Sequence, residues 1–210
     1  ESGYSVDNIN PSTPTNLFAF GDNNNSNISW SYDFDSDFNY HQISDFNDNL
    51  YFTTENNIQI PLNDSYNEYF INSIDINGNI SEVSDYVSAH NLDNGVNLIS
   101  FRVIPDNNFI ENLFENTNID GLISEGESAI LDNDGNWHGS LTHIIPNKGY
   151  WVRSTDDEIL NIVGQEIDSI NYYLHEGPNL ISYGCKSTGL VENIISNEEL
   201  NNCKKIYKHC

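Results

Sequence analysis

Three aspartates at alternate positions, Asp33, Asp35 and Asp37, are the best candidates for chemistry in this chain. Ca²⁺ takes six to eight oxygen ligands, and a D-x-D-x-D run can direct several carboxylates at one ion. The glycine and the distal glutamate of an EF-hand loop are missing here. The alternative is an acidic loop between two strands of a very acidic protein. Calcium at this loop is the one cofactor that the sequence suggests.

Aromatic residues in two later runs are candidates for stacking against sugar rings. Trp137 stands in a W-x-G-S-L run, and Tyr150 and Trp151 stand in K-G-Y-W-V. Aromatic platforms of this kind occur in carbohydrate-binding modules. The same residues lie in strand-like runs, where a small domain needs large side chains to fill its core. Both interpretations stay open, and the core interpretation is favoured.

The run Asp132-Asn133-Asp134-Gly135-Asn136 offers a similar choice. Its carboxylates suggest a calcium loop, but its glycine comes too early for one. The runs on either side are strand-like, which favours a hairpin turn.

The motifs of several enzyme classes are missing from the sequence. It contains no G-x-S-x-G, H-E-x-x-H, G-x-x-x-x-G-K-[ST] or G-x-G-x-x-G pattern. The run His175-Glu176-Gly177 precedes a proline, which would break the helix that a zinc-binding H-E-x-x-H motif requires. His138 and His143 are five residues apart, so on one strand they would point to opposite faces. We therefore expect no enzymatic activity in this chain.

The three cysteines, Cys185, Cys203 and Cys210, all lie near the carboxyl end of the chain. An odd number allows one disulfide and leaves one thiol over, and Cys185 with Cys203 is the pair that we expect in an oxidising compartment. A zinc site with His209 would lack the C-x-x-C spacing that structural zinc sites favour.

The charge balance excludes two classes of partner. Against 32 Asp and Glu there are only 7 Lys and Arg, which gives the 210 residues a formal net charge of -25. Such a surface repels nucleic-acid phosphates and anionic lipid head groups. No run of 18 apolar residues occurs, so we expect no membrane insertion. The chain also has no Met, even at position 1, which suggests a fragment or a processed product.

Short β-type runs separated by turn residues dominate the first 90 residues. The expected strands cover residues 15–20, 27–32, 38–46, 50–53, 57–60, 68–76 and 82–89. No segment among them has a helical period. Seven short strands in about 80 residues predict a β-sandwich.

Parts of this region resemble a fibronectin type III domain. The resemblance lies in PSTPTNL, in Trp30, and in NEYFINSIDINGNISEVSDYVSA, and it covers about residues 11–89. It implies that Trp30 is the core tryptophan and that Tyr69 is the tyrosine corner. The pair Asn77-Gly78 between two β-type runs independently predicts a hairpin. This resemblance implies a fold and is nearly silent on function.

An internal repeat follows. The run LDNGVNLISF at 92–101 returns as LHEGPNLISY at 174–183, an offset of 82. We expect a linker or the tail of a preceding domain at 1–10, the sandwich at 11–90, one copy of a β-rich (α+β) repeat module at 91–165, and an incomplete second copy at 171–210. Within the first copy we expect strands at 97–103, 129–132, 137–142, 149–153 and 159–163, and a helix at 108–116. These repeats are similar to modules of large extracellular proteins of marine bacteria.

The sequence therefore predicts a mainly β, non-catalytic spacer, adhesion or binding region of a larger secreted or surface protein. Its expected partners are a polysaccharide or another surface protein. Two alternatives stay open. One is an accessory, carbohydrate-binding region of a secreted polysaccharide-degrading or peptidase enzyme, and the other is a calcium-rigidified stalk.

Overall fold

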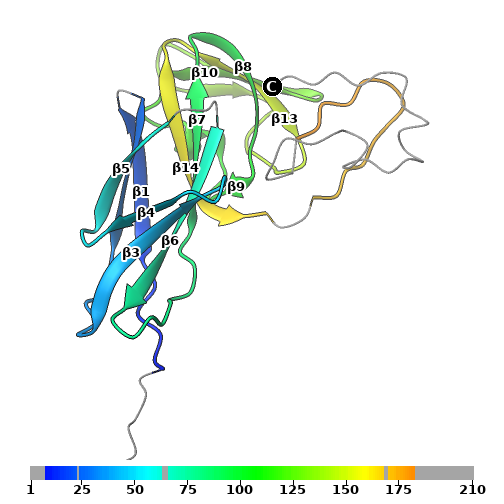
Figure 1. The fold of residues 1–210 in the computed structure, drawn as a ribbon. Coiled ribbons are helices and arrows are strands. Elements are labelled where there is room, and N and C mark those ends of the chain that lie inside the picture. The colour runs from blue at the N-terminus through cyan, green and yellow to red at the C-terminus, as the bar shows by residue number, and fades with distance from the viewer. Residues whose placement is uncertain (1–7, 23, 63–65, 168–169, 183–210) are drawn as a thin grey trace, which may run out of the picture.

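The computed structural model describes residues 8–22, 24–62, 66–167 and 170–182 (Figure 1). The prediction of a mainly β protein is confirmed, because strands account for almost all of its regular structure. The first seven strands are β1 (Thr15–Asp22), β2 (Asn25–Ser31), β3 (Phe38–Asp45), β4 (Leu50–Thr53), β5 (Asn57–Pro61), β6 (Tyr66–Asp75) and β7 (Tyr86–Leu92). They are followed by β8 (Gly95–Ser100), β9 (Val103–Ile104), the helix α1 (Ile110–Leu113), β10 (Ile119–Ser124), β11 (Glu127–Leu131), β12 (Trp137–Gly139), β13 (Gly149–Ser154) and β14 (Glu158–Glu166).

The first seven strands form the predicted β-sandwich. One sheet has the order β1-β2-β5, and strands β4-β3-β6-β7 belong to the other. Every second residue of β2 is buried, as expected for a strand with one face on a core. Trp30 is 6% exposed and lies in this core, as the resemblance implied. Tyr69 is fully buried in the same core, but no backbone group of the described residues accepts a hydrogen bond from its hydroxyl.

Three hairpin turns share one construction. Each has the sequence D-x-[ND]-[DG]-N, at 45–49, 75–79 and 132–136. In each turn the first aspartate accepts hydrogen bonds from the backbone N–H groups two and four residues later, at 2.8–2.9 Å. The fourth position has a positive φ in all three, 62° at Asp48, 88° at Gly78 and 81° at Gly135. The hairpin interpretation of the 132–136 run is therefore confirmed.

Most of the strands after β7 build a third sheet with the order β12-β11-β10-β13-β8. One face of it packs on a core that includes Phe101, Ile119, Leu122, Tyr150 and Val152. The expected helix at 108–116 is reduced to the single turn α1, because no side chain caps its first turn and Asn116 leaves the helical region with a φ of 61°.

Strand β14 does not join the sheet of the residues around it. It pairs antiparallel with β7, from Glu158 opposite Leu92 to Gly164 opposite Tyr86, and its end pairs with β9. The larger sheet therefore has the order β4-β3-β6-β7-β14-β9, and Figure 1 shows β14 beside β7. A strand from the range expected for the repeat module thus extends the sheet of the sandwich.

Both faces of the β7–β14 pair are buried. Ile159 and Val163 of β14 pack against the sandwich core, and Ser26 of β2 donates a hydrogen bond to Asn161 at 3.3 Å. Leu160 and Ile162, which point the other way, lie in the second core. The two cores therefore lie on opposite sides of one pair of strands, which both modules share.

Candidate functional site

A buried cluster of charge joins β6 and β14 to the segment between β8 and β9. The Arg102 guanidinium lies between the carboxylates of Glu68 on β6 and Glu166 on β14, with N–O distances of 3.3 and 2.5 Å. The three side chains are only 4–6% exposed. We call Glu68, Arg102 and Glu166 the junction cluster. Its formal charge is minus one, since two carboxylates share one guanidinium.

Arg102 is held in the junction cluster because the residues on either side of it are buried. Phe101 and Val103 are 1% and 0% exposed, so Arg102 stands in an apolar stretch between β8 and β9. Its backbone carbonyl accepts a hydrogen bond of 3.0 Å from the N–H of Ile167, directly after β14. The side chain then reaches across to β6, which ties three segments of the chain together.

Two further titratable groups lie beside the cluster. The Tyr66 hydroxyl donates a 2.7 Å hydrogen bond to Glu68, and burial together with the charge of Glu68 raises the pKa of Tyr66 well above 10. His90 stacks near Tyr66, with ring centroids 4.8 Å apart, and burial lowers the pKa of His90 to about 4. His90 is therefore neutral at pH 7 and adds no positive charge.

This arrangement suits structural rather than catalytic chemistry. The two carboxylates are held by Arg102 and are nearly inaccessible, so neither is placed to exchange protons with a bound substrate. Buried ion clusters of this kind are costly to break, because removing one partner leaves an uncompensated charge.

The predicted calcium ligands are not brought together. The Asp35 carboxylate accepts hydrogen bonds from the Ser12 N–H at 2.7 Å, the Ser12 hydroxyl at 3.2 Å and the Tyr32 hydroxyl at 2.7 Å. The backbone hydrogen bond from Ser12 is the largest cause that lowers the pKa of Asp35. Within the described part of the chain, which includes Asp33 and Asp37, no three His, Cys, Asp or Glu residues form a group that could hold a metal ion.

Asp35 thus fastens the N-terminal segment to the loop between β2 and β3. Calcium binding by Asp33, Asp35 and Asp37 stays a prediction. Melting temperatures measured with calcium and with a chelator would test it.

The predicted aromatic platform is divided between two faces. Tyr150 is 0% exposed, lies in the second core, and accepts a 2.9 Å hydrogen bond from the N–H of Ile145. Trp137 packs against the same core. Trp151 follows Tyr150 on β13 and so points to the opposite face of the sheet, where it is half-buried. Tyr150 and Trp137 thus contribute to the second core, and the ring of Trp151 lies on the other face of the sheet.

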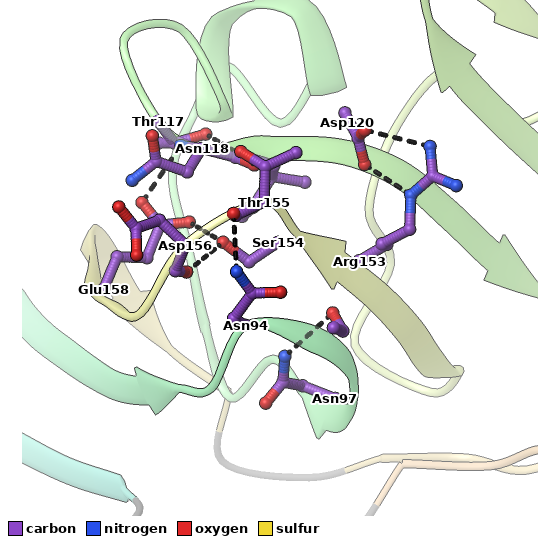
Figure 2. A network of polar contacts seen from close by, with 12 residues as sticks. Asn94, Asn97, Thr117, Asn118, Asp120, Arg153, Ser154, Thr155, Asp156 and Glu158 are labelled. Carbon is purple, nitrogen blue, oxygen red and sulfur yellow. Dashed lines mark hydrogen bonds and ion pairs between the residues drawn. The ribbon is translucent and has the colours of Figure 1, made fainter.

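The loops at one end of the third sheet form a separate polar network (Figure 2). Asn94 donates to the Thr155 carbonyl at 2.7 Å, and Ser154 donates to Glu158 at 2.9 Å. Figure 2 also shows Arg153 facing Asp120, an exposed ion pair of 2.6 Å. Each of these side chains is used within the protein, so the network fixes loops and offers no assembled site.

The same loop geometry occurs at both copies of the sequence repeat. Asn97 accepts a 3.0 Å hydrogen bond from the Asp93 N–H, and Asn179 accepts one of 2.9 Å from the His175 N–H. The glycines two residues before each asparagine have φ values of 113° and 110°. The predicted disulfide residues Cys185 and Cys203 lie outside the described residues.

The sequence interpretation missed the junction cluster. Arg102 is one of two arginines in a very acidic chain, and it stands between Phe101 and Val103. A rare cation in an apolar run is a signal for a buried ion pair, because an isolated buried charge would be too costly. The identity of its partners, 34 and 64 residues away, was not readable from this signal.

Comparisons with known proteins add little. No protein-family model matches the sequence, and no characterised protein matches it. Among solved structures, the crystal structure of chicken CNTN1 FN1-FN3 domains is similar, with 11% sequence identity and a TM-score of 0.29. The match covers 75% of this chain and 65% of that one. The fold described above therefore rests on its own strands and cores. No helix in the described part of the chain is long and apolar enough to cross a membrane.

Proposed function

We propose that the chain is a non-catalytic spacer and binding region of a larger secreted or cell-surface protein. The observation that carries this proposal is the shared pair of strands, β7 and β14, whose two faces are buried in two different cores. Modules joined by a plain linker move relative to each other by default. Modules that share a sheet cannot move relative to each other without exposing a core.

The junction cluster supports the same conclusion. Rotation of the second module away from the sandwich would separate Arg102 from Glu68 and take the guanidinium away from the buried Glu68 carboxylate. It would also separate Phe101 from His90, whose rings lie 5.6 Å apart. A unit that holds its two halves in one orientation sets a fixed distance between whatever precedes and follows it.

The charge of the chain suits a surface location. A net charge of -25 keeps copies of the protein apart and soluble, and it disfavours adsorption to anionic lipids. An antibody against the chain should label intact producing cells or the culture medium. Signal that appears only after the cells are lysed would contradict the surface location.

Rigidity can be tested directly by NMR. Residual dipolar couplings from amides beside the two cores should fit a single alignment tensor, because the shared strands fix one orientation. A requirement for two different tensors would overturn the spacer proposal.

A further inference from the structure

A wide, shallow hollow lies beside β3 and β4, at one edge of the larger sheet. Its volume is about 630 Å³, within the range of about 300–1,000 Å³ that is typical of small-molecule sites. The residues that line it are Asn39, Tyr40, Phe52, Thr53 and Thr54. Strand β4 comes first in the order of this sheet, so its outer side pairs with no described strand. A long ligand can therefore extend past the sheet edge at this point.

The alternation of side chains along β4 turns one aromatic ring into the hollow. Tyr51 packs against the sandwich core, so the next residue, Phe52, points away from the core and is 57% exposed. Gln42 of β3 lies opposite Phe52, and Tyr40, two residues before Gln42, shares the same face. The ring centroids of Tyr40 and Phe52 are 5.6 Å apart and the ring planes meet at 79°. The two rings therefore form a corner with two apolar walls.

An amide and three hydroxyls supply the polar part of the lining, and each of them can donate and accept hydrogen bonds. Within the described part of the chain, the side-chain amide of Asn39 and the hydroxyls of Tyr40 and Thr54 make no hydrogen bond. The Thr53 hydroxyl accepts one of 3.0 Å from the Glu55 N–H and keeps its own proton to donate. The hollow thus offers unused donors and acceptors beside two aromatic rings.

The lining is uncharged, although the chain contains 32 Asp and Glu. A cationic ligand would find no carboxylate among the lining residues to pair with. An anionic ligand would be repelled by the net charge of -25. A neutral ligand that is rich in hydroxyl groups fits this lining, because it can bond to the amide and the hydroxyls and needs no counter-charge.

We propose that this hollow binds a pyranose ring of a neutral, β-linked glucan. All substituents of a β-glucose ring are equatorial, so each face of the ring presents only C–H groups and the hydroxyls point outward around its rim. One aromatic wall stacks on such a face, the other wall closes the side, and the Asn39 amide and the threonine hydroxyls bond to the rim. The inference rests on the proposed binding role and names its ligand class.

The experiment is an NMR titration of the whole chain with cellotetraose. Resonances of the Asn39 side-chain amide and of the Tyr40 and Phe52 rings should shift and saturate, with a dissociation constant on the order of 1–10 mM. The control ligand is cellotetraose in which every C6 is oxidised to a carboxylate. It has the same rings and linkages but is anionic, so at low salt it should bind about tenfold more weakly or not at all.

Matched variants locate the site. Phe52→Ala removes one wall and should weaken binding by about tenfold. Phe18→Ala removes a ring that is 62% exposed on β1, in the other sheet of the sandwich, and binding should stay within about twofold of the wild type because that ring does not line the hollow. Tyr40→Phe keeps the ring, removes one hydroxyl and should weaken binding several-fold.

The proposal is wrong if the wild-type shifts do not saturate, if the oxidised tetramer binds equally well, or if Phe18→Ala weakens binding as much as Phe52→Ala. If Phe52→Ala does not fold, Tyr40→Phe decides: unchanged affinity overturns the site. The dipolar couplings test the rigid spacer independently. A single tensor without glucan binding would remove this site alone and leave the spacer in place.

Discussion

Replacing Arg102 by Met should be among the most damaging single changes in this protein. Met keeps much of the side-chain volume but removes the guanidinium that pairs with the buried carboxylates of Glu68 and Glu166. Their side chains are 4% and 6% exposed, so solvent cannot compensate them. Breaking a buried pair by removing one partner costs about 3–5 kcal/mol.

For a chain of this size, a loss of 1 kcal/mol lowers the melting temperature by about 2–4 °C. Arg102→Met should therefore melt about 6–20 °C below the wild type. Thermal unfolding measures the melting temperature, and equilibrium unfolding in urea measures the free energy of unfolding. Both are followed by fluorescence from Trp30 in the sandwich and from Trp137 and Trp151 in the second module. Because the modules share β7 and β14, we expect one transition in both proteins.

Arg153→Met is the matched control. Arg153 also pairs with a carboxylate, Asp120, but its side chain is 48% exposed, so its loss should have a much smaller effect. The triple variant Glu68→Gln, Arg102→Met, Glu166→Gln should regain most of the lost stability, because it removes all three charges of the junction cluster. Equal effects of the two single variants, or a triple variant no more stable than Arg102→Met, would refute this account of the junction.

Three further predictions concern single residues. Burial holds the pKa of His90 at about 4, against about 6.5 in an unfolded chain. As the pH falls from about 6.5 to about 4, His90 therefore binds a proton in the unfolded state before it does in the folded state. The free energy of unfolding, measured in urea, should drop by about 3 kcal/mol over that range. The variant His90→Leu should not show this drop. Asp45→Ala breaks a buried hairpin turn and should cost about 1–3 kcal/mol, whereas Asp132→Ala, in a separate turn of the same construction whose aspartate side chain is 34% exposed, should cost less. Gly164→Ala would place a methyl carbon 2.3 Å from the Ile104 carbonyl oxygen where β14 meets β9, so its melting temperature should fall by several degrees, and an unchanged one would contradict the close approach.

Much of the sandwich could be predicted because its signals are local. The alternation in β2 and the turn residues between strands mark each element without reference to its neighbours. The sequences DFNDN, DINGN and DNDGN carry a further signal that the predictions did not use, since all three form the same turn. That signal is physical, because the first Asp accepts two backbone hydrogen bonds and the fourth residue adopts a positive φ.

Other features depend on distant residues and could not be read in this way. Strand β10 was not predicted, since Gly121 stands in its middle and its pairing with β13 is irregular beside that glycine. The range of β14 was predicted as a strand, but a strand with two apolar faces does not reveal which sheet it joins. The junction cluster needs partners from three separate segments.

In the internal repeat, the hydrogen bonds of one loop explain which of its residues are identical in the two copies. In each copy the asparagine side chain accepts a hydrogen bond from the N–H four residues earlier and donates to the carbonyls four and two residues earlier. Only an amide can accept and donate in this way, and the positive φ two residues before it favours glycine. Asn97 and Asn179 are therefore identical, as are Gly95 and Gly177. The first loop residue contributes its backbone N–H and carbonyl to these bonds, so Asp93 in one copy and His175 in the other serve equally well.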